Sequence, residues 1–136
     1  MATFPPSPRV LTELDHVRIG KLLKHPGMAF AAELESVIDN AELVSSYAVP
    51  PDLVTMNSQV LIADEVLGEE RTLTLCYPPD ADPKTGFVSV LSPVGTALLG
   101  LAQGQTAHWA APNGEQASAK ILKVVFQPEE SGDYLR

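Results

Sequence analysis

Apolar positions in the first fifty residues recur with the period of a helix. Between residues 30 and 44 they recur at i, i+4, i+7, i+8, i+11 and i+14 and form one face: Phe30, Leu34, Val37, Ile38, Ala41 and Val44. An earlier stripe begins near Thr12, whose spacing from Asp15 resembles a capping box, and runs to about Lys24. Its members are Leu11, Leu14, Ile19, Leu22 and Leu23. We therefore predict an antiparallel helical hairpin, a short coiled coil with arms about 20 Å long, turning at "HPG".

The helical pattern ends at Pro50 and Pro51, because proline cannot continue a helix. Beyond them apolar and polar residues alternate with the period of a strand, and Asn113-Gly114 is a strong hairpin signal. The expected strands are 55–64, 71–78, 87–91, 106–111 and 116–127. The pattern predicts an α+β chain with two parts. An arm and helical hairpin occupy 1–49, and a mainly antiparallel sheet occupies 50–136.

The segment "LSPVGTALLG", 91–100, predicts one short helix inside this sheet domain. Ser92 is a good N-cap, and Pro93 suits the first helical position, where its missing N–H costs nothing. Leu98 and Leu99 are placed to face the sheet. Gly100 can adopt the left-handed conformation that closes a helix.

The charge balance bears on the kind of partner. Seventeen acidic residues against nine basic ones give a net charge of −8 and a pI near 4.7, with a mean hydropathy of +0.06. Proteins that bind free nucleic acid normally carry a basic surface, because neutralising phosphates supplies much of their affinity. We therefore expect no free nucleic acid partner. An acidic surface suits docking on a basic patch of another protein.

Candidate chemistry is sparse. Cys76 is the single cysteine and lies in a strand-like run, so we interpret it as a core residue. The three histidines, His16, His25 and His108, lack metal-ligand spacing. Paired acids at 64–65, 69–70 and 129–130 flank predicted turns, where carboxylates are usually solvated. We predict no catalytic residue, metal or cofactor.

Targeting signals are also lacking. The first residues, "MATFPPSPRVL", do not resemble a signal peptide, and no apolar stretch is long enough to span a bilayer. We expect a cytoplasmic protein with no membrane partner.

The stretch "VSVLSPVGTALLGLAQGQTAHWAAPNGEQASAKILKV", 88–124, resembles the C-terminal domain of the Gre transcript-cleavage factors (GreA and GreB). The shared pattern is a strand, Ser-Pro, an Ala-Leu-Leu-Gly helix and a Pro-Asn-Gly hairpin. The resemblance is closer to one branch, the Rnk-type regulators of nucleoside diphosphate kinase, through "DLVTMNSQV" (52–60), "SPVGTALLGL" (92–101) and "FQPEESGDYL" (126–135). It implies an FKBP-like fold for the sheet domain.

The resemblance also implies a function. In the Gre family this domain docks on the β′ coiled coil at the rim of the secondary channel of RNA polymerase, and an acidic coiled-coil tip provokes RNA cleavage. Here the tip, 24–30, contains no carboxylate, and its arms are too short to reach the catalytic centre. Cleavage needs hard oxygen ligands at the catalytic magnesium. The resemblance therefore implies a polymerase-binding regulator that competes with Gre factors without stimulating cleavage and affects nucleoside diphosphate kinase indirectly.

The family's docking patch corresponds to Leu91, Ser92, Pro93 and Val94 here. The residue before the Ser-Pro pair, usually Asp or Asn, is Leu91, which implies a more apolar contact. Two alternatives stay open. One is a direct protein inhibitor of a kinase. The other is an FKBP-like prolyl isomerase, although its pocket would be aromatic-lined and the aromatic residues are scattered along the sequence.

Overall fold

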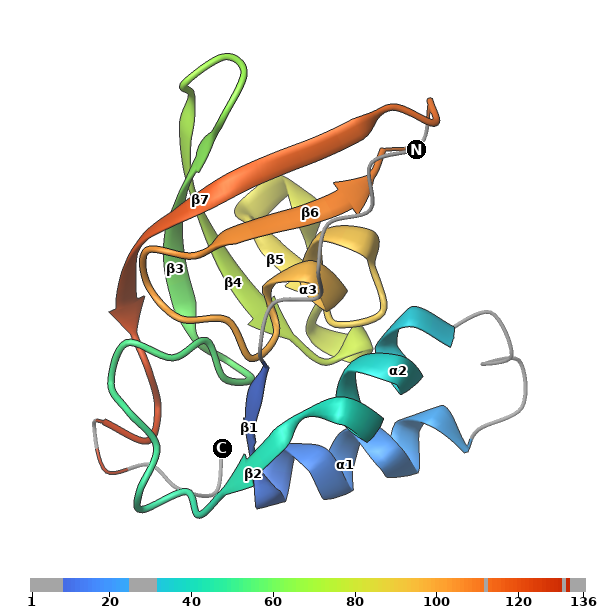
Figure 1. Cartoon of the computed structure of the whole chain (residues 1–136), viewed down its shortest axis with the longest axis vertical. Coiled ribbons are helices and arrows are strands. Elements are labelled where there is room, and N and C mark those ends of the chain that lie inside the picture. Colours follow the sequence, from blue (N-terminus) through green and yellow to red (C-terminus); the bar gives the residue numbers. More distant parts are fainter. Residues whose placement is uncertain (1–8, 25–31, 112, 131, 133–136) are drawn as a thin grey trace.

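A curled five-stranded sheet organises the computed structural model, which describes residues 9–24, 32–111, 113–130 and 132 (Figure 1). The sheet order is β5 (Phe87–Ser89), β4 (Glu70–Cys76), β3 (Gln59–Asp64), β7 (Gln116–Phe126) and β6 (Thr106–Ala110). Neighbouring strands are antiparallel, except that β5 runs parallel to β4. The chain is therefore a mixed α+β protein, and the predicted mainly antiparallel sheet is confirmed.

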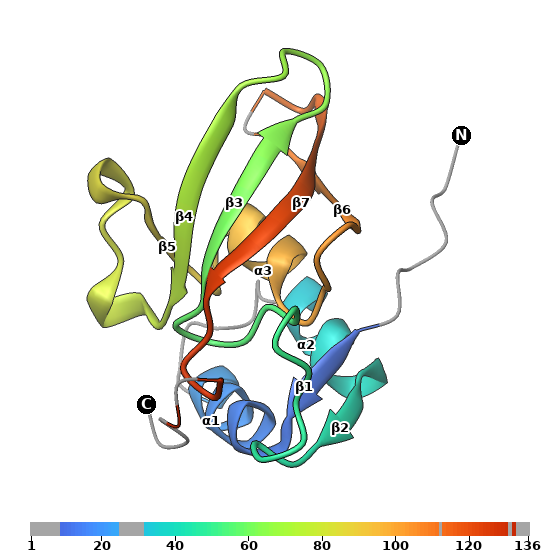
Figure 2. The same cartoon turned by 90° about the vertical axis from the view of Figure 1, so that its left-hand side faces the viewer.

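Helix α3 (Pro93–Leu98) packs on one face of this sheet, and Figure 2 shows the opposite face without a covering helix in the described part of the chain. Alternation along the strands accounts for the asymmetry. Val60, Ile62, Leu75 and Ile121 point to the covered face and are fully buried with Leu98 and Leu99 from the helix segment. The expected facing of these two leucines is confirmed. Cys76 is also buried, as predicted for a core residue.

The connection from β4 to β5 contains two short 3-10 turns, η1 (Pro78–Asp80) and η2 (Pro83–Thr85). The predicted hairpin at Asn113-Gly114 is confirmed, since β6 and β7 pair antiparallel across it. In that turn the side-chain oxygen of Asn113 accepts from the Glu115 N–H at 3.0 Å.

The N-terminal segment contains helices α1 (Glu13–Leu23) and α2 (Ala32–Asn40), as the periodicity predicts. It also contains a feature that the periodicity misses. Strands β1 (Val10–Thr12) and β2 (Glu42–Val44) pair in parallel, so Leu11 and Val44 belong to strands and not to the helical stripes. The second helix ends at Asn40, four residues early, because the next residues pair with β1. A three-residue strand leaves too little alternation to compete with a helical stripe.

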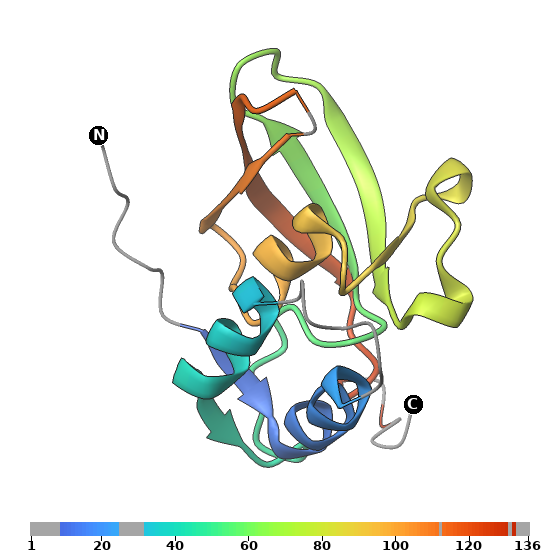
Figure 3. The ribbon, with the colours of Figure 1, turned by 90° about the vertical axis from the view of Figure 1, so that its right-hand side faces the viewer.

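Both helices bury their apolar faces in the core of the sheet domain. Ile19 of α1 and Leu34 and Ile38 of α2 belong to the same buried cluster as Val54 and Leu98. Figure 3 shows α1 and α2 below α3, at the end of the molecule opposite the β3–β4 turn. The predicted turn between the helices falls on residues 25–31, outside those described. The division at residue 50 therefore remains a prediction about folding, whereas the core itself is shared.

Candidate functional site

The segment before α3 is a turn held by its own hydroxyl groups. The Ser92 hydroxyl accepts from the Gly95 N–H at 3.0 Å, which is the predicted N-cap, and donates to the Ser89 carbonyl at 2.7 Å. The Leu91 N–H donates to the Ser89 hydroxyl at 3.0 Å. With Pro93 at the first helical position, these bonds fix the backbone of residues 89–95. The predicted capping and proline positions are confirmed.

The helix that follows lies unusually close to the end of strand β5. A Cβ atom on Gly95 would stand 2.0 Å from the Ser89 carbonyl oxygen, so this helical position requires glycine. The hydroxyl of Thr96 reaches back to the Val90 carbonyl at 2.7 Å. The first turn of α3 is thereby tied to the strand end by backbone packing as well as by side-chain hydrogen bonds.

The four candidate partner-binding residues differ in what they offer a partner. Pro93 is exposed, whereas Leu91 and Val94 are half-buried and pack against the core. Ser92 is half-buried, and its hydroxyl is engaged on both sides inside the chain. The turn therefore presents a proline ring with apolar edges beside it. Its polar groups mainly hold the turn in shape.

The far end of α3 is held by the N-terminal segment. The Arg9 guanidinium donates to the carbonyls of Thr96 and Leu99 at 3.0 and 2.6 Å, and so caps the helix from outside. Gly100 has φ +80°, the predicted left-handed closing conformation, and a Cβ there would stand 3.0 Å from the Val10 carbonyl oxygen. Strand β1 therefore passes directly over this glycine. Arg9, at the end of the expected N-terminal arm, is therefore part of the fold.

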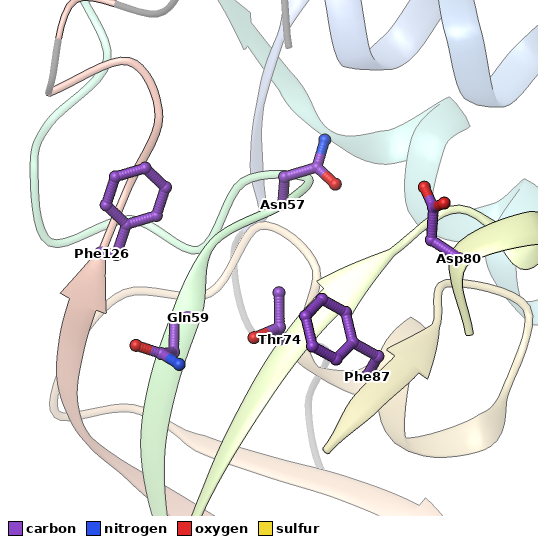
Figure 4. Close-up of a pocket in the computed structure, with 6 residues that line it drawn as sticks. All are labelled: Asn57, Gln59, Thr74, Asp80, Phe87 and Phe126. Carbon is purple, nitrogen blue, oxygen red and sulfur yellow. The ribbon is translucent and has the colours of Figure 1, made fainter. Parts of the chain in front are cut away.

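A cleft of about 440 Å³ lies beside strands β3, β4, β5 and β7 (Figure 4). Phe126 stands on one side and Phe87 on the other, with Gln59 and Thr74 between them. Asn57 and Asp80 complete the lining. Two of the four phenylalanines, 39 positions apart in the sequence, thus line one cleft. Only the pairing β5-β4-β3-β7 brings them together.

A buried polar cluster joins α1 to both ends of the sheet domain. Asp15 is 2% exposed, and its carboxylate accepts from the Met56 N–H at 3.1 Å. The Thr55 hydroxyl donates to the Glu129 carboxylate at 2.7 Å and lies 2.8 Å from the Ser58 hydroxyl. Glu129 is only 9% exposed, so the expectation that residues 129–130 are solvated is wrong for Glu129. Because Thr55 gives its proton to Glu129, Ser58 is the donor to Thr55.

The electrostatics of this cluster follow from its burial. Desolvation raises the pKa of Asp15 to about 6, and the nearby Glu129 carboxylate adds to the rise. The hydrogen bonds from Met56 and Thr12 and the charge of Arg18 lower the pKa of Asp15.

Gln127, also buried, donates from its side-chain nitrogen to the carbonyls of Pro50 and Leu53 at 2.7 and 2.8 Å. The stretch after β7 thereby fixes the loop that leads into β3. A polar residue inside "FQPEE" offers no sequence signal of burial.

Within the described ranges no group of three or more His, Cys, Asp or Glu side chains is placed to hold a metal ion. None of the helices in that same part of the chain is long and apolar enough to cross a membrane.

The chain is similar to known transcription factors. The family described as "Transcription elongation factor, GreA/GreB, C-term" matches residues 49–126. The regulator of nucleoside diphosphate kinase from Escherichia coli (strain K12) is 40% identical over 129 residues, which are 93% of this chain and 95% of that protein. The transcription elongation factor GreA of Methylobacterium nodulans is 37% identical over 94 residues, 69% of this chain and 59% of that factor.

A solved structure shares the fold over most of the chain. A prokaryotic transcription elongation factor GreA/GreB from Nitrosomonas europaea superposes with a TM-score of 0.74 at 38% identity, covering 89% of this chain and 100% of that one. These relatives carry the names of regulators and elongation factors, not of enzymes. The chain therefore belongs to the GreA/GreB family of transcription factors, as a regulator similar over nearly its whole length to the regulator of nucleoside diphosphate kinase.

Proposed function

We propose that this chain is a non-enzymatic transcription regulator that binds RNA polymerase through Leu91, Ser92, Pro93 and Val94. It docks on the β′ coiled coil at the rim of the secondary channel, occupies the place of Gre factors and so competes with them. Its effect on nucleoside diphosphate kinase is then indirect. The observation that carries the proposal is the exposed Pro93 ring on a turn that its neighbours already hold in shape.

A turn of this kind suits a docking role for an energetic reason. Binding normally costs free energy because loops and side chains lose freedom. Here the Ser92 and Ser89 hydroxyls and the close contact at Gly95 have already restricted the backbone. The apolar edges of Leu91 and Val94 suit a contact that is less polar than one made by Asp or Asn. This agrees with the replacement of the usual acidic or amide residue by Leu91.

The same proposal includes the absence of stimulated RNA cleavage. Helices α1 and α2 have 11 and 9 residues, so they extend about 17 and 14 Å. The segment 24–30 between them has no Asp or Glu. An arm of this length without a carboxylate at its tip supplies no oxygen ligand to a catalytic magnesium ion. We interpret the two helices as a short coiled-coil hairpin and the sheet domain as FKBP-like.

Polymerase binding is tested with Pro93→Asp. Aspartate is favourable in the first turn of a helix, so this change should leave the melting temperature nearly unaltered. It puts an unpaired charge against a surface that must lose water, so affinity for core RNA polymerase should fall at least tenfold. The matched control is Pro51→Asp, also an exposed proline but outside the turn. Equal binding by Pro93→Asp and the unchanged chain would place the interface elsewhere.

Competition and cleavage are tested on stalled elongation complexes. The chain should displace a Gre factor and suppress the RNA cleavage which that factor provokes. Added alone at saturating concentration, it should leave the polymerase's intrinsic cleavage rate unchanged. Faster release of short 3′ RNA fragments would contradict the proposal.

A second candidate is a protein that acts directly on nucleoside diphosphate kinase, because a relative 40% identical to this chain is named as its regulator. Direct action predicts that purified chain changes the activity of purified kinase without polymerase present. The prolyl isomerase alternative now has the cleft between Phe87 and Phe126 in its favour. A peptide isomerisation assay with Phe87→Ala as control tests it.

A further inference from the structure

The turn between β3 and β4, residues 64–69, exposes two large apolar side chains at its tip. Val66 is 85% exposed and Leu67 is 71% exposed, the highest and third highest values among the exposed large apolar residues described. They are adjacent in sequence and lie at the far end of the molecule from β2 (Figures 1 and 3). Single exposed apolar residues are common on protein surfaces. An adjacent pair at one turn is not explained by folding, because neither side chain belongs to the core.

The turn is also held in one shape. A single carboxylate oxygen of Asp64 accepts from the N–H groups of both Val66 and Leu67, each at 2.8 Å. The Gly68 N–H donates to the Asp64 carbonyl at 2.8 Å, and the Glu65 N–H donates to the Ser118 carbonyl of β7 at 3.2 Å. The two bonds to Asp64 keep the pKa of its carboxyl below the usual value. The apolar pair is thus presented on a pre-organised backbone.

The charges around this pair select among partners. Glu65, Glu69 and Glu70 are all exposed beside it, against two cations on the adjoining strands, Arg71 of β4 and Lys120 of β7, which pairs with Ala63. Anionic lipid surfaces attract basic segments, so this acidic rim opposes insertion of Val66 and Leu67 into a membrane. Nucleic acid is repelled for the same reason. A protein surface with an apolar depression and a rim of Lys or Arg fits both the apolar pair and the glutamates around it.

We infer that the β3–β4 turn is a second contact with RNA polymerase, in which Val66 and Leu67 fill an apolar depression rimmed by basic side chains. This inference rests on the proposed function and extends it to a surface outside residues 91–94. Within this second contact the apolar pair supplies most of the binding free energy, since buried apolar anchors dominate interfaces. The three glutamates steer association.

The experiment measures affinity and association rate of the full chain for purified core RNA polymerase. V66S/L67S should weaken binding at least tenfold and leave the melting temperature unchanged, because both side chains are exposed. E65Q/E69Q/E70Q should slow association about threefold and flatten its dependence on salt. The matched control is Leu43→Ser, which removes an apolar side chain, 44% exposed, from β2 at the other end of the molecule. It should bind like the unchanged chain.

The outcomes separate the two claims. If the unchanged chain binds, Pro93→Asp weakens binding at least tenfold and V66S/L67S binds normally, the inference is wrong and the proposed function stands. If the unchanged chain does not bind polymerase at all, both are wrong. Binding of the unchanged chain and of V66S/L67S to vesicles with about one third anionic lipid is measured as well. Vesicle binding that V66S/L67S removes, with polymerase affinity unaltered, would assign the turn to membranes and overturn the inference.

Discussion

Helices α1 and α3 begin in the same way and are held in different ways. Each is capped by a hydroxyl group that accepts a backbone N–H three residues on, Thr12 from Asp15 and Ser92 from Gly95, both at 3.0 Å. Each also contains a glycine, which normally weakens a helix by about 1 kcal/mol relative to alanine. These local features give no reason to expect the two helices to differ in sensitivity to mutation.

The surroundings of the two glycines separate the helices. A Cβ on Gly20 of α1 would meet no atom of the described residues within 4 Å, whereas one on Gly95 would collide with the Ser89 carbonyl. Helix α1 touches the sheet domain through Ile19 and the Asp15 cluster, with Val17 exposed. Helix α3 has four buried positions among its six residues. The comparison teaches that local capping starts a helix, and packing decides how much change it tolerates.

The largest expected effect comes from removing α1 together with the rest of residues 1–49. The fragment 50–136 should still unfold cooperatively, because its sheet and α3 remain. Its stability should fall by roughly 5 kcal/mol, since Leu11, Ile19, Leu34 and Ile38 each contribute about 1.5–3 kcal/mol when buried, partly against one another. Chemical denaturation with two spectroscopic probes measures this. A fragment without a cooperative transition would show that both parts fold as one unit.

Gly95→Ala comes next. Overpacking usually costs about 1–3 kcal/mol, and a clash with backbone lies at or above the upper end of that range. We expect a loss of at least about 3 kcal/mol, because the Ser89 carbonyl oxygen cannot rotate away as a side chain would. The matched control is Gly20→Ala, which should stabilise the chain by up to about 1 kcal/mol. If Gly95→Ala and Gly20→Ala both stabilised or both destabilised the chain, the proposed difference in packing between α1 and α3 would be wrong.

Asp15→Asn tests the polar attachment of α1. The pKa of Asp15 is raised in the folded chain from 3.8 to about 6, so the folded state holds its proton more tightly than the unfolded state does. Its contribution to stability is therefore present at low pH and is lost as pH rises from about 4 to about 6, by roughly 3 kcal/mol in total. Asparagine does not titrate. The unfolding free energy of Asp15→Asn should therefore lack this fall. The measurement is chemical denaturation of both proteins at pH 4 and pH 7, and the two changes in unfolding free energy are compared. Parallel pH curves would show that Asp15 has an ordinary pKa.

The smallest effects are expected at the caps. Thr12→Ala and Ser92→Ala should each cost about 1 kcal/mol, the usual value of an N-cap. In Ser92→Ala the Ser89 carbonyl loses the hydroxyl donor but still accepts from the backbone N–H of residue 92. Thr12→Ser and Ser92→Thr keep a capping hydroxyl and serve as controls in urea denaturation. A cost at Ser92 several times that at Thr12 would mean that the bond from its hydroxyl to the Ser89 carbonyl contributes more to stability than the cap does.

Features whose partners lie a few residues apart could be predicted from the sequence. The caps at Thr12 and Ser92, the proline at the start of α3 and the left-handed Gly100 all depend on local backbone geometry. Strand alternation and the Asn113-Gly114 turn likewise placed the sheet. The capped start of α3 was predicted for this reason, whereas the choice of 91–94 as a docking patch came from the resemblance to the Gre factors. The half-burial of Leu91 and Val94 was not predicted.

Contacts between distant segments could not be predicted in this way and depend on how the whole chain packs. The parallel pairing of β1 with β2 joins residues 32 positions apart, and the bond from Thr55 to Glu129 spans 74. The close approach at Gly95 depends on how β5 ends beneath α3, and the cleft depends on the sheet order. No residue in these pairs signals its partner, because hydrophobic period and turn chemistry act over a few residues. Which distant surfaces meet is settled when the whole core packs.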